Sequence, residues 1–166
     1  MTKPRRVGPT LHLVLRAAES SRIAGRRVNL LDEHNSLARR NGVVALAKFG
    51  AKPGDASIDR LVCQIASGRS TRLYLVFKRG SRFSGYAASM SAIRMGQDAG
   101  DWTGLAPSYY ADVDVIPGLW LLLRGELRPA GLADLRLATN GRKLLDVVAE
   151  CRTAAMLVTT QKESGG

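Results

Sequence analysis

The stretch RLYLVFKRGSRFSGYAASMSAI, residues 72–93, decides the fold. RLYLVF at 72–77 is apolar at successive positions, which predicts a strand that is buried on both faces and is therefore central in a sheet. The polar, glycine-containing turn KRGSR at 78–82 joins it to SGYAASMSAI at 84–93, the expected partner strand. The stretch predicts a pair of strands at the centre of the domain.

Segments on either side of this pair predict the rest of an α+β domain. Strands are expected at 10–15, at 42–50 and over YADVDVI at 110–116, and buried apolar runs lie at 119–123 and 156–158. Apolar residues recur at helical spacing in LLDEHNSLARR at 30–40 and in ASIDRLVCQIASG at 56–68, with Ile58, Leu61, Val62 and Ile65 on the buried stripe. SSRIAGRR at 20–27 predicts a basic loop. We expect a small mixed sheet, curled like a β-barrel, with flanking helices.

The 166 residues fit one domain of ordinary globular composition, with 45% hydrophobic and 23% charged residues. We place the domain at 10–158, a basic tail at 1–9 and a flexible tail at 159–166. The net charge of +11 is uneven: residues 1–82 carry 17 Lys and Arg against 5 Asp and Glu, whereas residues 83–166 carry 8 against 9. Such a field attracts nucleic acid or an acidic membrane surface. The alternative is a basic face that serves solubility alone.

Catalytic and metal-binding signatures are missing from the sequence. Cys63 and Cys151 lie far apart, and with His12 and His34 they give no zinc-binding spacing. No segment has the length of a membrane span, and the apolar run after the basic start is too short for a signal peptide. We therefore expect a soluble, cytoplasmic, monomeric protein that is not an enzyme and needs no cofactor.

Two alternatives stay open. Asp112 and Asp114 fall on one face of the strand predicted at 110–116, where two carboxylates can hold magnesium. That arrangement fits a metal-dependent enzyme or toxin of nucleic-acid metabolism. A basic, antitoxin-like domain that docks an acidic protein is the other alternative.

Features of nucleic-acid binding are better represented. Basic residues stand at both ends of the strand at 72–77, where they can grip phosphates, and TNGR at 139–142 places an arginine directly after a tight turn. The expected backbone contacts are Lys78, Arg79, Arg82, Arg142 and Lys143. Trp102, Tyr109 and Tyr110 lie in or near the glycine-flanked loop GDWTGLAPSYY at 100–110 and offer flat faces for stacking a base.

The order of these segments resembles YTH domains. RLYLVFKRGSRFSGYAASM at 72–90 is similar to the central strand pair of that family, and NGVVALAKFG at 41–50 to its "GVW" strand. DWTG falls where the family carries a tryptophan on a mobile loop, YADVDVI resembles the strand after that loop, and TNGRKLLDVVAECRTAAMLV resembles the closing segment. The resemblance runs from about residue 10 to 158, and it also fits the wider EVE and PUA-like superfamily.

This resemblance implies a pocket in which a single modified base, typically N6-methyladenine, enters an aromatic cage. The expected pocket residues are Trp102, Leu105, Val44, Arg16 and Tyr109. Val44 stands where the first cage tryptophan of the family belongs, which leaves one wall of the cage aliphatic. If Trp102 forms a wall of the pocket, replacing Trp102 with alanine is expected to cost little stability. We expect a module that binds single-stranded or flipped-base RNA or DNA, with the sugar and the modification left open.

Overall fold

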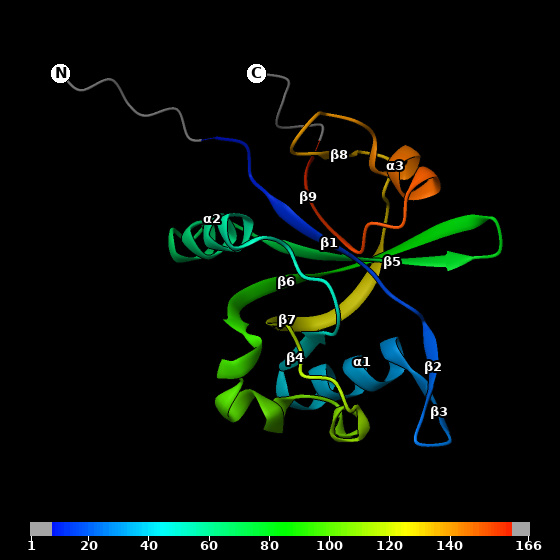
Figure 1. The fold of residues 1–166 in the computed structure, drawn as a ribbon. Helices are drawn as coiled ribbons and strands as arrows, with labels where there is room; N and C mark the ends of the chain where they lie inside the picture. The colour runs from blue at the N-terminus through cyan, green and yellow to red at the C-terminus, as the bar shows by residue number, and fades with distance from the viewer. Residues whose placement is uncertain (1–7, 161–166) are drawn as a thin grey trace.

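Seven strands form one mixed sheet in the order β4–β7–β6–β5–β1–β9–β8 (Figure 1). The computed structural model describes residues 8–160, so residues 1–7 and 161–166 of the two expected tails lie outside it. The strands are β1 His12–Arg16, β4 Val43–Lys48, β5 Arg72–Arg79, β6 Arg82–Met95, β7 Leu119–Ala130, β8 Leu135–Leu137 and β9 Ala155–Thr160. Thr159 and Thr160, placed in the expected C-terminal tail, complete β9.

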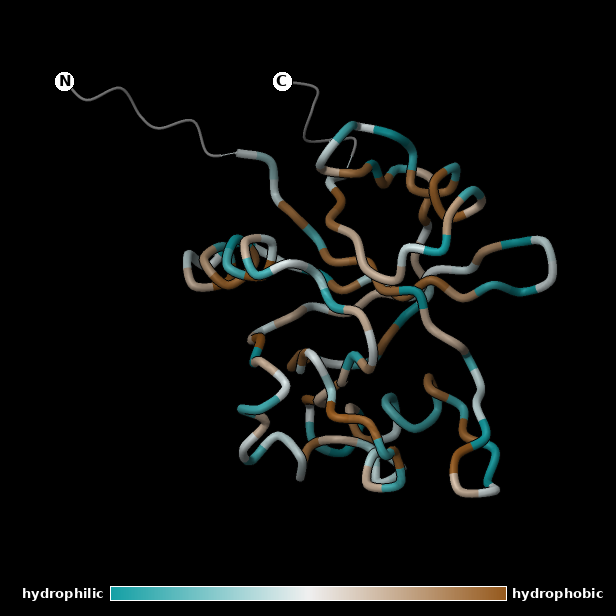
Figure 2. The backbone as a smooth tube through the Cα atoms, in the orientation of Figure 1, coloured by the Kyte–Doolittle hydropathy of each residue, from teal (hydrophilic) through white to brown (hydrophobic). Residues whose placement is uncertain are grey.

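The strand pair predicted at 72–93 is the middle of this sheet. β5 is the fourth of the seven strands, antiparallel to β6 and parallel to β1. Leu73 and Phe77 on one face and Val76 on the other are at most 2% exposed. The prediction that RLYLVF is a central strand with two covered faces is confirmed. Figure 2 shows hydrophobic colour where the central strands cross and hydrophilic residues toward the tip of the β5–β6 hairpin.

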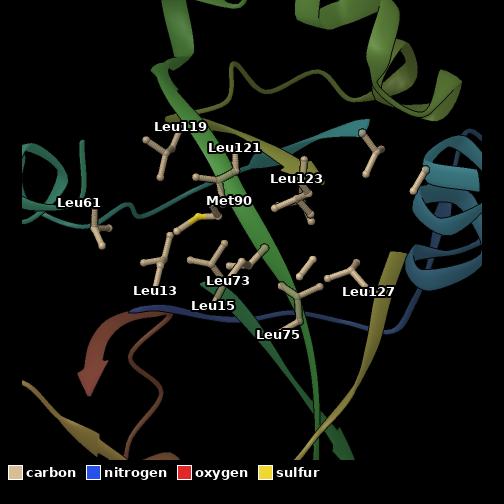
Figure 3. Close-up of a cluster of buried hydrophobic side chains, with 14 of the residues drawn as sticks. Leu13, Leu15, Leu61, Leu73, Leu75, Met90, Leu119, Leu121, Leu123 and Leu127 are labelled. Atoms are coloured by element: carbon tan, nitrogen blue, oxygen red, sulfur yellow. The ribbon is translucent and has the colours of Figure 1, made fainter. Parts of the chain in front are cut away.

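The sheet is strongly curled but open. The register between β6 and β7 shifts at two places in β6, between Ala87 and Ser89 and between Met90 and Ala92. Such bulges increase the bend and twist of a strand. As a result, leucines of β1 and β5 face leucines of β7 across an apolar interior (Figure 3). β4 and β8 are the two edges, so the expected α+β class and curled sheet are confirmed while the barrel remains unclosed.

Two longer helices and one short one cover the sheet: α1 Leu30–Asn41, α2 Asp55–Ala66 and α3 Leu144–Glu150. The Asn29 side chain accepts a hydrogen bond from Asp32 N–H at the start of α1, and Gly42 ends the helix at a φ of 75°. In α2, Val62 is 42% exposed, so its expected place on the buried stripe is wrong. Gln64 is buried there because its amide group bonds both backbone groups of Leu11. None of the helices within residues 8–160 has the length and apolarity to cross a membrane.

Two segments differ from the expected elements. The strand expected over YADVDVI is absent: three 3-10 helices, η1 Gly96–Asp98, η2 Gly100–Leu105 and η3 Ser108–Asp112, lead to an irregular connection before β7. Tyr110 N–H donates to Pro107 O and Val113 N–H to Tyr110 O, so local turns replace a strand ladder. The loop expected at 20–27 is a hairpin of β2 Ser20–Ile23 and β3 Arg26–Asn29, which forms a separate two-stranded sheet.

Candidate functional site

A cavity of about 440 Å³ opens between the end of β4, the η2–η3 region and the start of β7. Three aromatic side chains line it: Phe49, Tyr110 and Trp120. The Tyr110 ring is 5.3 Å from Phe49 at 84° and 5.9 Å from Trp120 at 68°, measured between ring centroids. Rings at such angles form adjoining walls, which is a suitable geometry for a flat apolar ligand.

Hydrogen bonds fix the orientation of Tyr110. Its hydroxyl lies 2.6 Å from Nε2 of His34 and accepts from Ala47 N–H at 3.2 Å. His34 Nδ1 lies 2.8 Å from Leu30 O, which can only accept, so Nδ1 carries the proton and Nε2 accepts from the tyrosine hydroxyl. Burial lowers the pKa of His34 to about 4 and raises the pKa of Tyr110 well above its usual value. The pair is therefore neutral at pH 7, and the ring is rigidly placed.

The Trp120 indole N–H has no hydrogen-bond partner within the described residues, although its nitrogen is buried. Trp120 lies on β7, between Ala47 of β4 and Arg94 of β6, and its side chain lines the cavity. Buried donors are almost always satisfied, but this nitrogen has almost no accessible surface, so an acceptor on a ligand reaches it only when the side chains that cover it move aside. Asp114, Thr103 and Ser108 bring further polar groups to the cavity wall.

Charge beside the cavity is mixed. Lys48 Nζ donates to Phe49 O at 2.6 Å, and burial lowers the pKa of that lysine. Asp114 is exposed and also lines the cavity. Within residues 8–160, no three His, Cys, Asp or Glu side chains come together in a way that holds a metal ion.

Trp102, expected as a pocket wall, is buried behind this cavity. Its side chain is 5% exposed and packs in one apolar cluster with Ala45, Ala47 and Trp120. The Arg94 guanidinium lies 4.2 Å from the ring centroid, and it also donates to Asp101 at 2.9 Å. One face of Trp102 is thus covered by a cation, and the ring does not line the cavity.

Leu105, Tyr109 and Val44 also lie outside the cavity lining. Leu105 is half-buried in the cluster of Trp102, and Tyr109 is buried with its ring 4.8 Å from Tyr110. Burial raises the pKa of Tyr109 to about 12. Val44 is fully buried on the other face of β4, in the main core, because successive strand residues alternate between faces. Ala45 and Ala47 are the β4 residues that face the Trp102 cluster.

Arg16 lies in a different part of the molecule. Its guanidinium donates to the carbonyls of Val148, at 3.1 Å, and Cys151, and is stacked over Phe83. These bonds cap the end of α3, where the last carbonyls of a helix lack partners within it. Arg16 therefore ties β1 to α3 and does not border the aromatic cavity.

The five expected backbone contacts gather around the β5–β6 hairpin and α3. Lys78, Arg79 and Arg82 surround the hairpin tip, beside a groove of about 520 Å³ lined by Arg79, Phe83, Tyr86 and Leu145. Arg79 is paired with Glu19 and Arg142 with Glu150, at 2.6 Å for the latter. Lys78, Arg82 and Lys143 make no ion pair within the described residues. The hairpin with these cations is at one end of β6, and Arg94, which pairs with Trp120, is at the other end.

Sequence reasoning missed two of the three rings in the cavity. LWLLL was correctly interpreted as a buried run, but its alternation places Leu119, Leu121 and Leu123 in the main core and Trp120 on the other face. Phe49 directly follows β4 and reaches the cavity from the strand end. The alternation of LWLLL was a usable signal for Trp120, whereas nothing local marked Phe49.

Comparison with known proteins yields one distant structural likeness. No family model matches the chain, and no curated protein matches it. Among solved structures, the crystal structure of the YTH domain of the Zygosaccharomyces rouxii MRB1 protein, in complex with N6-methyladenosine RNA, is similar at a TM-score of 0.41 and 16% identity. The alignment covers 99% of this chain and 89% of that one.

Proposed function

We propose that this protein is a non-enzymatic module that binds single-stranded nucleic acid and takes one base into the cavity between Phe49, Tyr110 and Trp120. The observation that carries this proposal is a set of three aromatic walls that includes a buried N–H donor with no partner among the described residues. Aromatic walls bind any flat base by stacking, and the unpaired Trp120 N–H adds a preference for a base with an acceptor on that side once the ligand displaces the side chains that cover it.

A base with a methylated exocyclic nitrogen fits this chemistry best. The methyl group adds apolar surface inside an aromatic enclosure, and a ring nitrogen of adenine accepts the Trp120 N–H. An N6-methyladenine-like nucleotide is therefore the ligand that we propose. A single strand is the easier substrate, since extruding a base from a duplex costs a few kcal/mol.

The backbone contacts in this proposal are made by cations on both sides of the molecule. Lys48 stands beside the cavity and can reach a phosphate of the bound nucleotide. Lys78, Arg82 and Lys143 form the basic end at the β5–β6 hairpin, where Tyr86 and Phe83 border a groove. Arg79 and Arg142 join them only if their pairs with Glu19 and Glu150 open. A nucleic-acid strand that contacts both the cavity and the β5–β6 hairpin must run along the length of β6.

Replacing Phe49 with alanine is expected to weaken binding of a methylated single-stranded oligonucleotide by about 1–3 kcal/mol, the contribution of one stacked base. Phe49 is half-buried, so the loss of stability is expected to be smaller than for a core aromatic residue. Fluorescence polarisation with RNA and DNA oligonucleotides, each with adenine or N6-methyladenine, measures both affinity and preference. Phe83→Ala, a half-buried phenylalanine at the far groove, is the matched control and should leave the preference for the methylated base unchanged.

Trp120→Phe tests the free donor separately, because it keeps an aromatic wall and removes the N–H. Affinity is expected to fall by about 1 kcal/mol, the net value of one hydrogen bond. The preference for stacking ligands should persist. If Phe49→Ala and Trp120→Phe both bind every oligonucleotide as the wild type does, the cavity is not the base-binding site.

A further inference from the structure

The β2–β3 hairpin, residues 20–29, projects from the body as a narrow arm (Figure 1). Its two strands pair with each other and with no strand of the main sheet. The turn is made by Ala24 at a φ of 50° and Gly25 at a φ of 76°. Two left-handed residues give the tight turn that matches the twist of a hairpin. Alanine is an uncommon residue in that conformation, so the arm does not have the most stable turn sequence available.

Three arginines lie on this arm with no acid to balance them. Arg22, Arg26 and Arg27 are exposed and make no ion pair or hydrogen bond through their side chains within residues 8–160. Residues 20–31 contain no Asp or Glu, and the preceding Glu19 is paired with Arg79. The arm thus carries three uncompensated charges over six residues.

Two of these arginines are direct cross-strand neighbours. Arg22 stands opposite Arg27 in the register, and Val28, the next residue after Arg27, is 3% exposed. Because neighbouring residues point to opposite faces, Val28 marks the face toward the body and Arg22 and Arg27 share the outward face. Like charges placed directly opposite destabilise a hairpin. A bound anion between the two guanidinium groups converts that repulsion into attraction.

We propose that the β2–β3 arm binds the phosphate backbone of nucleic acid, with Arg22 and Arg27 holding one phosphate between them on the outward face. Guanidinium groups bind phosphate oxygens in a bidentate manner, and all three cations of the arm are arginines. The exposed remainder of the arm is Ser20, Ser21, Ala24 and Gly25. It lacks the exposed large apolar side chains by which surface segments enter a membrane. The site rests on the charge of the arm and does not depend on the aromatic cavity.

The test uses the full chain and unmodified oligouridine, a probe that makes no demand on base recognition at the cavity. Arg22→Gln and Arg27→Gln are each expected to weaken binding about tenfold. The dependence of log affinity on log salt should become less steep by roughly 0.7 for each phosphate that the variant no longer neutralises. The melting temperature should stay equal or rise, since each variant removes a repulsive neighbour.

Arg60→Gln is the matched control, because Arg60 is exposed on α2 and makes no ion pair within the described residues. The substitution lowers the net charge by the same amount as each arm variant. It should leave both affinity and salt dependence close to those of the wild type. An equal loss in Arg60→Gln overturns the arm as a site, and so does an unchanged salt dependence in the double variant Arg22→Gln/Arg27→Gln, which removes both cations from the shared phosphate. A lower melting temperature of the arm variants also overturns it, as that result assigns these arginines to folding.

The result also separates the arm from the cavity and from a membrane. Arm variants should lose affinity equally for methylated and unmethylated RNA, whereas cavity variants change the preference between them. Binding of wild-type protein to vesicles that contain phosphatidylserine, without binding to oligouridine, overturns nucleic acid as the partner.

Discussion

Replacing Trp102 with alanine is expected to lower the free energy of unfolding by about 3–5 kcal/mol, the usual cost of removing a buried aromatic side chain. Trp102 is 5% exposed and packs against Ala45, Ala47 and Trp120. Two of those neighbours are alanines, whose short side chains cannot extend into the space that the indole leaves. The sequence-based expectation of a small effect is thus reversed by the packing. Urea denaturation of wild type and variant measures the difference.

Trp102→Phe is the graded companion to this variant, and it should lose less stability because a ring still fills most of the space. It also leaves Trp120 as the single tryptophan, since the chain contains two. Its fluorescence then reports the cavity alone, and it should change when a methylated oligonucleotide binds. A Trp102→Ala protein that melts with the wild type but no longer prefers the methylated base would return Trp102 to the ligand site.

Strong local patterns made the central fold predictable. RLYLVF needs both faces covered, and only an interior strand offers that, so β5 followed directly from six residues. The basic segment 20–27 was harder, because its hairpin has one buried apolar side chain, Val28, and a turn of Ala24 and Gly25 rather than a typical Asn-Gly pair. The strand expected over YADVDVI failed because alternation there reflects exposed acids near turns and not pairing with a neighbour.

The aromatic site depended on contacts that sequence spacing does not contain. Val44 was expected at the cavity, but a shift of one residue along a strand moves a side chain to the other face, and Ala45 is the residue that faces the cluster of Trp102 and Trp120. Tyr110 and Phe49 are 61 positions apart, and their meeting depends on how η3 folds back over the end of β4. Composition pointed to the aromatic loop, and Tyr110 of that loop lines the cavity, whereas the choice of ring within the loop required the tertiary structure.

The basic residues illustrate the same limit in electrostatic terms. Arg79 and Arg142 were expected as backbone contacts from their turn positions, and the fold brings acids within reach of both. Arg16 was expected near the pocket and instead satisfies carbonyls at the end of α3. Counting charges along the chain shows where positive potential is high, but the partners of each arginine decide which ones remain free for a phosphate.

Acidification is expected to destabilise the protein by about 3 kcal/mol through His34 alone. The pKa of His34 is lowered from 6.5 to about 4 in the folded state, because burial disfavours the charged ring. Above pH 6.5 the ring is neutral in both folded and unfolded chains, so it adds no pH dependence there. Between pH 6.5 and 4 the unfolded chain binds a proton that the folded chain does not, and stability falls as the pH falls.

The cavity itself should respond only around pH 4, where the folded protein takes up this proton, because a proton on Nε2 removes the acceptor that orients the Tyr110 hydroxyl. Urea denaturation at several pH values between 7 and 4 measures the stability, and NMR titration of the histidine resonances measures the pKa directly. The His34→Gln variant identifies the His34 signal in the NMR titration. It is also the control for stability, because the variant should lose the part of the pH dependence that comes from His34 while the carboxylates contribute as before. A His34 pKa near 6.5, or equal pH dependence in the two proteins, would show that the His34–Tyr110 bond is not held in a closed, water-excluding site. In that case the rigid wall that the cavity needs for stacking would be missing as well.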